Sequence, residues 1–126
     1  MQSSIAGPAW LRFALGRRMS TYYYVTRNSG PFVREGRREI SEAEWRGVVA
    51  IDPELAIEQP EPSPGVPRNA LWAVWRSYPG GYPAWFALIQ GDIEVKEIDA
   101  ALLGKLQQFA SALDARIFCE TGEEFT

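Results

Sequence analysis

The chain has no histidine and one cysteine, Cys119. Without histidine it lacks the side chain that most often acts as a general base near neutral pH, and the commonest ligand of transition metals. Catalytic pairs of serine or cysteine with histidine are excluded for the same reason. One cysteine permits neither an intrachain disulfide nor a zinc site built from several cysteines. We therefore expect no cofactor and no metal site, and we interpret Cys119 as a small core residue on a strand.

Sequence motifs of the common enzyme classes are also missing. The chain contains no P-loop, no dinucleotide-binding G-x-G-x-x-G and no nucleophile elbow G-x-S-x-G. Four carboxylates that lie close in sequence could carry glycosidase-type or metal-assisted chemistry: Asp92, Glu94, Glu97 and Asp99. However, Glu94 alternates with apolar residues as on a strand, and Asp99 is placed to cap a helix. We favour solvated structural roles for these acids and predict no catalytic residue.

No apolar run approaches the length that crosses a bilayer, and we expect a cytoplasmic protein without a membrane partner. In residues 1–18, Arg12 interrupts the apolar stretch and the other two arginines follow it, which is unlike a secretory signal. We interpret residues 1–18 as a leader or an upstream-start extension, with a short basic amphipathic anchor as the alternative. Residues 19–126 are then predicted to form a single α+β domain.

Charge is divided unevenly along the chain. Residues 1–40 contain seven arginines and two glutamates, a net charge of +5, whereas residues 41–126 contain six basic and fourteen acidic residues, a net charge of −8. The two values sum to the formal charge of −3. Such asymmetry can mark a surface that meets a charged partner, or it can reflect solvated faces beside a basic leader.

The stretch after residue 84 predicts a hairpin, a long helix and a closing strand. Residues 84–89 are almost wholly apolar, and residues 93–96 alternate apolar with charged side chains, so both indicate strands joined by a turn at 90–92. Asp99 is the expected helix cap, and Ile98 and Leu103 have the spacing of a hydrophobic staple. The inward stripe of this helix is predicted to hold Leu102, Leu106, Phe109, Ala110 and Leu113, and its outer face Lys105, Gln107, Gln108 and Ser111. A strand at 116–120 and a loosely ordered acidic end should follow.

The first half of the chain has one strong helix signal. Ser41 and Glu44 match a capping box, and a helix is predicted from Ser41 to near Asp52, because Pro53 should end it. We expect this helix to direct four residues inward: Trp45, Val48, Val49 and Ile51. Strands are predicted at 21–27 and 71–76, with a short one at 56–59, and exposed loops at 60–67 and 77–83.

Consecutive strands joined by tight turns favour an antiparallel meander. We predict a two-layer α+β fold, in which about five strands form a mainly antiparallel sheet and two helices pack on one face.

Five aromatic residues gather within fourteen positions: Trp72, Trp75, Tyr78, Tyr82 and Trp85. Because strand residues alternate between faces, these side chains cannot all point into one core. Exposed tryptophan and tyrosine are favoured anchors of protein interfaces, so we predict a partner-binding site here. A second small core layer is the alternative. Only Arg68 and Arg76 lie near these aromatics, so we expect no nucleic-acid partner.

Four motifs together resemble a family of small uncharacterised bacterial proteins. The motifs are I-S-x-x-E-W at Ile40–Trp45, D-P-E-L at Asp52–Leu55, G-D-I-x-V-K at Gly91–Lys96 and A-L-D-A-R-I-F-C-E-T-G-E-E at Ala112–Glu124. The resemblance covers roughly residues 20–126. It carries no established activity, so no functional residue is implied by it. The chain is also similar in style to cytoplasmic immunity proteins of bacterial toxin systems.

We hypothesise that the chain is a non-enzymatic protein-binding module, immunity-like in that its acidic surface would meet a basic toxin domain. A second hypothesis is a small-molecule binder or weak hydrolase that uses the aromatic loop at residues 78–85 and nearby acids. A homodimer formed through a sheet edge or the aromatic face is compatible with the first hypothesis.

Overall fold

The computed structural model describes residues 21–67 and 69–125, and these form one antiparallel sheet with two helices. In chain order the elements are β1 (Tyr22–Thr26), α2 (Glu42–Ala50), β2 (Leu55–Ile57), β3 (Leu71–Trp75), β4 (Ala84–Ile89), β5 (Asp92–Lys96), α3 (Ala100–Leu113), β6 (Arg116–Cys119) and β7 (Glu124–Phe125). The seven strands lie in the order β2-β3-β4-β5-β1-β6-β7. The predicted leader, residues 1–18, lies outside the described residues.

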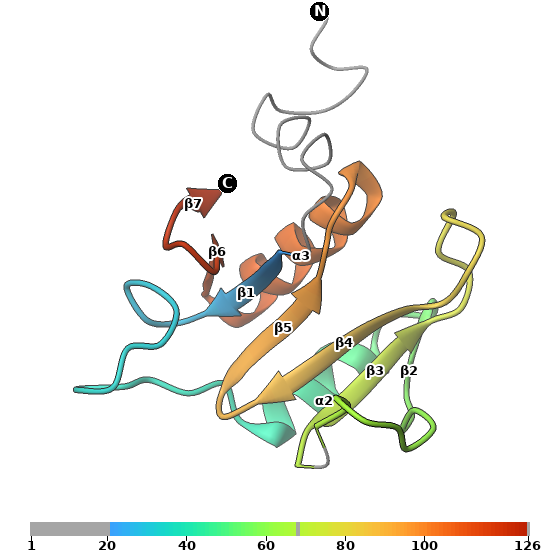
Figure 1. The fold of residues 1–126 in the computed structure, drawn as a ribbon, viewed down its shortest axis with the longest axis horizontal. Helices are drawn as coiled ribbons and strands as arrows, with labels where there is room; N and C mark the ends of the chain where they lie inside the picture. Colours follow the sequence, from blue (N-terminus) through green and yellow to red (C-terminus); the bar gives the residue numbers. More distant parts are fainter. Residues whose placement is uncertain (1–20, 68, 126) are drawn as a thin grey trace, which may run out of the picture.

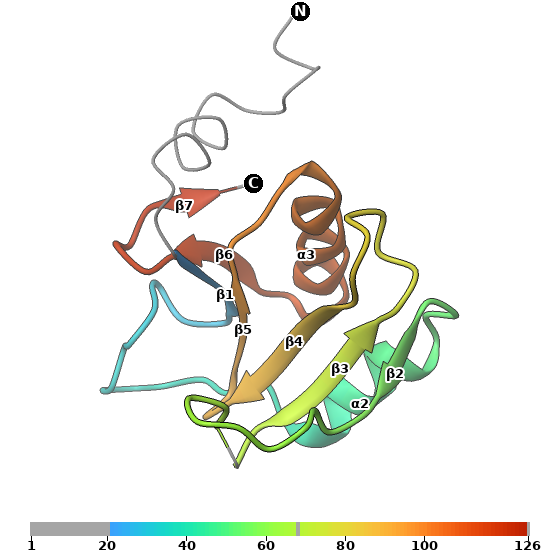
Figure 2. The ribbon, with the colours of Figure 1, turned by 45° about the vertical axis from the view of Figure 1, so that its right-hand side comes forward.

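Both helices cover the same face of the twisted sheet (Figures 1 and 2). In Figure 1, α2 lies behind β3 and β4, and α3 lies behind β1 and β5. The predicted α+β class is therefore confirmed, but the sheet has seven strands rather than about five. β7 was not predicted. It pairs with β6 and brings Phe125 to 5.9 Å from Tyr23 between ring centroids, which closes one edge of the core.

The β4–β5 hairpin has a two-residue turn, Gln90-Gly91, flanked by the paired residues Ile89 and Asp92. Both turn residues have positive φ, 50° and 86°, which is the geometry of a type I′ turn. Gly91 is needed for a second reason, because a Cβ atom there would overlap the backbone and side chain of Glu39.

The capping box predicted for the first helix is present. The Glu44 backbone N–H donates to Ser41 Oγ at 3.1 Å, and the Ser41 backbone N–H donates to Glu44 Oε1 at 3.0 Å. Trp45 and Val49 point inward as expected. The prediction for Ile51 is wrong, since its side chain is 80% exposed. α2 ends at Ala50, so Ile51 is the C-cap and lies beyond the inward stripe.

The centre of the core is a run of three aromatic rings. Phe109 of α3 packs edge-on against Trp45 of α2 at 5.0 Å and against Phe86 of β4 at 5.1 Å between ring centroids. All three side chains are essentially inaccessible to solvent. The indole N–H of Trp45 donates to the Leu71 carbonyl at 3.1 Å, so this large residue is buried without an unmet polar atom. These contacts join both helices to the sheet. At one edge of the same core lies Cys119, which confirms its expected position.

Lys105 was predicted to face outward, and this prediction is wrong because only 4% of the residue is exposed. Its ammonium lies 2.9 Å from Asp52 Oδ2, 2.8 Å from Glu54 Oε1 and 4.6 Å from the ring centroid of Trp75. Burial lowers the pKa of Lys105, but the hydrogen bonds to Glu54 and Asp52 outweigh burial and raise it. The spacing of apolar residues in the helix could not predict that Lys105 is buried, because both carboxylates come from the distant segment between α2 and β2.

We expect Lys105→Met to lower the free energy of unfolding by about 2–3 kcal/mol. Methionine keeps an apolar stem over Trp75 but leaves Asp52 and Glu54 without their cation, and partial exposure of Glu54 limits the cost. Urea unfolding of the full chain measures this difference. Gln108→Met, on the exposed side of the same helix, should stay within about 0.5 kcal/mol of wild type. A Lys105→Met variant as stable as wild type would contradict the role assigned to the ammonium.

A second prediction concerns acid stability. The two guanidinium nitrogens of Arg27 donate to Glu44 at 2.9 and 2.7 Å, and this contact, with the Ser41 backbone N–H, lowers the pKa of Glu44 to about 2. A carboxylate with a lowered pKa stabilises the folded state above pH 4.5, and this contribution is lost as the pH falls toward 2. Glu44→Gln keeps the capping box but removes the charge. The difference in unfolding free energy between wild type and variant should shrink between pH 5 and pH 2, and a constant difference would contradict the prediction.

Candidate partner-binding face

The face of the sheet opposite the helices is covered by side chains and loops alone. Strand register places Trp72 and Val74 of β3, Trp85 and Ala87 of β4, and Glu94 of β5 on this helix-free face. Val74 and Ala87 are buried, whereas the two tryptophans and Glu94 are partly exposed above them. The continuation of the face onto β1 and β6 carries Tyr22, Tyr24 and Phe118. The helix-free face therefore contains a second apolar layer, to which Phe118, only 3% exposed, belongs.

The five predicted aromatic residues lie together but not on one face. Trp72 and Trp85 pack edge to face on the helix-free side, 6.1 Å apart between ring centroids. Trp75 points to the helix side, where it is buried, and its indole N–H donates to Ser77 Oγ at 3.1 Å. Tyr78 is buried beside Trp75, and Tyr82 is 64% exposed and packs on Tyr78 with ring centroids 5.6 Å apart. Only Trp72, Tyr82 and Trp85 therefore present substantial surface.

An aromatic groove of about 770 Å³ lies beside Trp72, Trp85 and the loop between β3 and β4. Its walls include the loops around residues 64–67 and 78–83, which follow β2 and β3. Five aromatic residues and a strand carboxylate contribute to its lining: Tyr22, Trp72, Tyr78, Tyr82, Trp85 and Glu94. The groove also reaches Asp99, which caps α3 through a 2.9 Å bond from the Leu102 N–H and accepts a hydrogen bond from the Tyr78 hydroxyl. These two bonds of Asp99 hold the aromatic loop against the start of α3.

Glu94 occupies the middle of the helix-free face. Burial raises the pKa of its carboxyl group, and a hydrogen bond from the Tyr24 hydroxyl acts in the opposite direction. Within the described part of the chain, no lysine or arginine forms an ion pair with Glu94. This carboxylate also lines a second hollow of about 510 Å³, next to the loop that follows β1. Glu94 thus lines both the aromatic groove and the second hollow.

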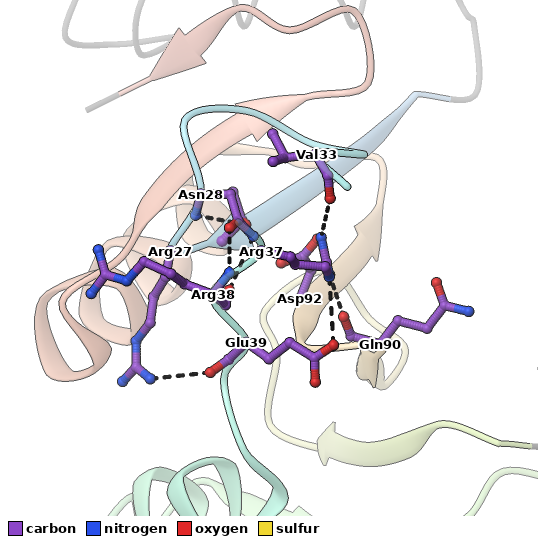
Figure 3. Close-up of polar contacts among 9 residues, drawn as sticks. Arg27, Asn28, Val33, Arg37, Arg38, Glu39, Gln90 and Asp92 are labelled. Carbon is purple, nitrogen blue, oxygen red and sulfur yellow. Dashed lines mark hydrogen bonds and ion pairs between the residues drawn. The ribbon is translucent and has the colours of Figure 1, made fainter. Parts of the chain in front are cut away.

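Part of the loop after β1, residues 32–34 and Arg37, lines the second hollow. Figure 3 shows polar contacts that hold this loop in place. Asn28 closes the base of this loop, since its side chain donates to the Arg38 carbonyl at 3.0 Å and accepts from the Arg38 N–H at 2.7 Å. Arg37 fastens the loop to the β4–β5 turn through Asp92, 3.0 Å away, and through the carbonyl of Gln90. Asp92 was expected to be solvated, but it is buried, because Arg37 and the loop cover it.

Phe32 lies in this loop and was not identified from the sequence. Its φ of 65° is unusual for a bulky residue, and its side chain is 64% exposed with the ring 5.3 Å from that of Tyr24. An exposed aromatic on a strained backbone position is a recurrent feature of functional sites. The Gly30-Pro31 pair signalled only a turn, so the sequence held no cue to this exposure.

Exposed large apolar side chains are concentrated around the aromatic groove and the second hollow. Of the four such residues that stand out in the described chain, Tyr22, Phe32 and Tyr82 line one or other of the two hollows. Ile51, at the end of α2, is the exception. A face that gathers exposed aromatics around a carboxylate is typical of a binding surface.

Comparison with protein families, with curated proteins and with solved structures finds no match to the chain. Within residues 21–67 and 69–125, no group of three histidine, cysteine, aspartate or glutamate residues is arranged to hold a metal ion. In the same part of the chain, no helix has the length and apolar character needed to cross a membrane.

The aromatic groove depends on a close approach at Gly80, which generates a third prediction. A Cβ atom at Gly80 would overlap the ring and hydroxyl of Tyr78. We expect Gly80→Ala to displace that ring from Asp99, to change the near-ultraviolet circular dichroism, and to cost about 1–3 kcal/mol of stability. Gly30→Ala is the control, because a Cβ there meets open space. A Gly80→Ala spectrum and stability equal to those of wild type would contradict this packing.

Proposed function

We propose that the chain is a protein-binding module and that its helix-free face contacts the partner. The observation that carries the proposal is the gathering of exposed aromatics, Tyr22, Phe32 and Tyr82, around the aromatic groove and the second hollow, beside the half-buried Trp72 and Trp85 of that face. Tyrosine, tryptophan and phenylalanine bury large areas at little cost in conformational entropy, which suits them to the centre of an interface. The two hollows would receive protruding side chains of the partner.

The charge of the groove favours a basic partner. Its charged lining residues in the described chain are three acids, Glu94, Glu97 and Asp99, and one base, Lys96. The excess of acids over residues 41–126 points the same way, and it would speed the encounter with a positively charged protein. We extend the proposal to an immunity-like protein that neutralises a basic toxin domain in the cytoplasm, on the resemblance described above. A catalytic role is not part of the proposal.

A small-molecule binder or weak hydrolase is the second candidate, and one observation favours it. The aromatic groove has a volume within the range of ligand pockets. Hydrolysis by paired carboxylates would need a second, partly desolvated acid beside Glu94. Asp99 is bound to the helix start and to Tyr78, and Glu97 is exposed to solvent. The groove volume therefore supports binding better than it supports hydrolysis.

We expect Tyr82→Ala to weaken the partner complex by at least about tenfold, because it removes an aromatic anchor that is 64% exposed and packs on the buried Tyr78. The full chain serves as bait in source-cell extract, with bound proteins quantified by mass spectrometry, and the captured partner is then titrated. Ile51→Ala is the matched control, since Ile51 is an exposed apolar side chain outside both hollows.

Equal capture by wild type, Tyr82→Ala and Ile51→Ala would contradict the assignment of the face, as would the absence of any stoichiometric partner. Sedimentation velocity of the purified chain tests the homodimer. Self-association that Tyr82→Ala abolishes would make a second copy the occupant of the face. Circular dichroism of each variant confirms that the fold is retained.

A further inference from the structure

The aromatic groove combines two features that favour a positive charge. Ring faces carry negative electrostatic potential, and Tyr22, Trp72, Tyr82 and Trp85 all contribute to its lining. Glu94 lies among them as a half-buried carboxylate that accepts a hydrogen bond from the Tyr24 hydroxyl. Arg37 lies in the neighbouring hollow but is engaged by Asp92 and by carbonyl groups. No lysine or arginine of the described chain therefore forms an ion pair with Glu94, although Lys96 lies two residues further along β5 and also lines the groove.

We propose that the groove binds a lysine or arginine side chain carried by an extended segment of the protein partner, with Glu94 as the charge acceptor. This inference rests on the proposed function and names the chemistry of its central contact. A cation that leaves water for this site regains favourable interactions from the rings and from the carboxylate together. A neutral side chain of equal length would gain only the apolar contact.

A peptide segment fits the groove better than a free ammonium ion does. The indole N–H of Trp72 is buried and has no acceptor among the described residues, so a bound segment would offer its backbone carbonyl to this donor after the ring turns toward the groove. The groove also extends from the loop that holds Tyr82 to Tyr22 on β1, which is room for several residues of an extended segment. One cationic side chain would occupy only part of that volume.

Titration of the isotope-labelled full chain with two short glycine-rich peptides tests the proposal by nuclear magnetic resonance. One peptide has a central lysine, and the other has the neutral isostere norleucine. We expect the lysine peptide to shift the signals of Glu94 and of the Trp72 and Trp85 indoles, with an affinity about tenfold higher than that of the norleucine peptide. Glu94→Gln, which retains an acceptor for Tyr24, should lose this preference.

Glu42→Gln is the control, because it removes an equal charge from the exposed first turn of α2. Failure of the lysine peptide to bind, equal affinity for both peptides, or a Glu94→Gln variant that binds like wild type would each overturn the inference. Tetramethylammonium that binds as tightly as the lysine peptide would overturn the assignment to a peptide segment. The partner titration with Tyr82→Ala remains an independent test, so the face can be correct even where this inference fails.

Discussion

Both helices pack on one face of the sheet, and the opposite face must exclude water without them. Side chains alternate along every strand, so each strand that buries residues beneath the helices also directs residues to the other side. Val74, Ala87 and Phe118 lie there and are buried. Aromatic side chains and long loops cover them, and this incomplete covering leaves the two hollows. The candidate site is thus a consequence of a two-layer architecture in which the second face has no helical layer.

The groove is connected to the core through a small number of polar contacts. Asp99 caps α3 and accepts a hydrogen bond from the Tyr78 hydroxyl, so one carboxylate holds both the helix start and the aromatic loop. On the helix side, the ammonium of Lys105 lies over Trp75, the neighbour of Tyr78 in the same aromatic cluster. Arg37 has a comparable role at the second hollow, where it joins the loop after β1 to the β4–β5 turn. Buried charges therefore occur where loops meet the sheet.

Local signals predicted the elements well, because their physical causes act over a few residues. The capping box at Ser41 and Glu44, the Asp99 cap and the Gln90-Gly91 turn each depend on neighbours in sequence, and all are present. Ile51 was predicted wrongly because the helix was expected to continue to near Asp52, whereas it ends at Ala50. The inward position of Lys105 could not be predicted, since its partners Asp52 and Glu54 are about fifty residues away.

The sequence by itself determined the α+β class, the helix boundaries to within a turn, and the division of the aromatic cluster between two faces, because periodicity and capping are local properties. Only the tertiary structure decided which aromatic residues are exposed. Trp75 and Trp85 both lie in apolar strands, yet strand register directs one beneath the helices and the other to the groove. The same register brings Tyr22 and Glu94 to that groove from strands about seventy residues apart. Exposure depends on which segments cover a residue, and the pairing of strands that are distant in sequence decides which segments those are.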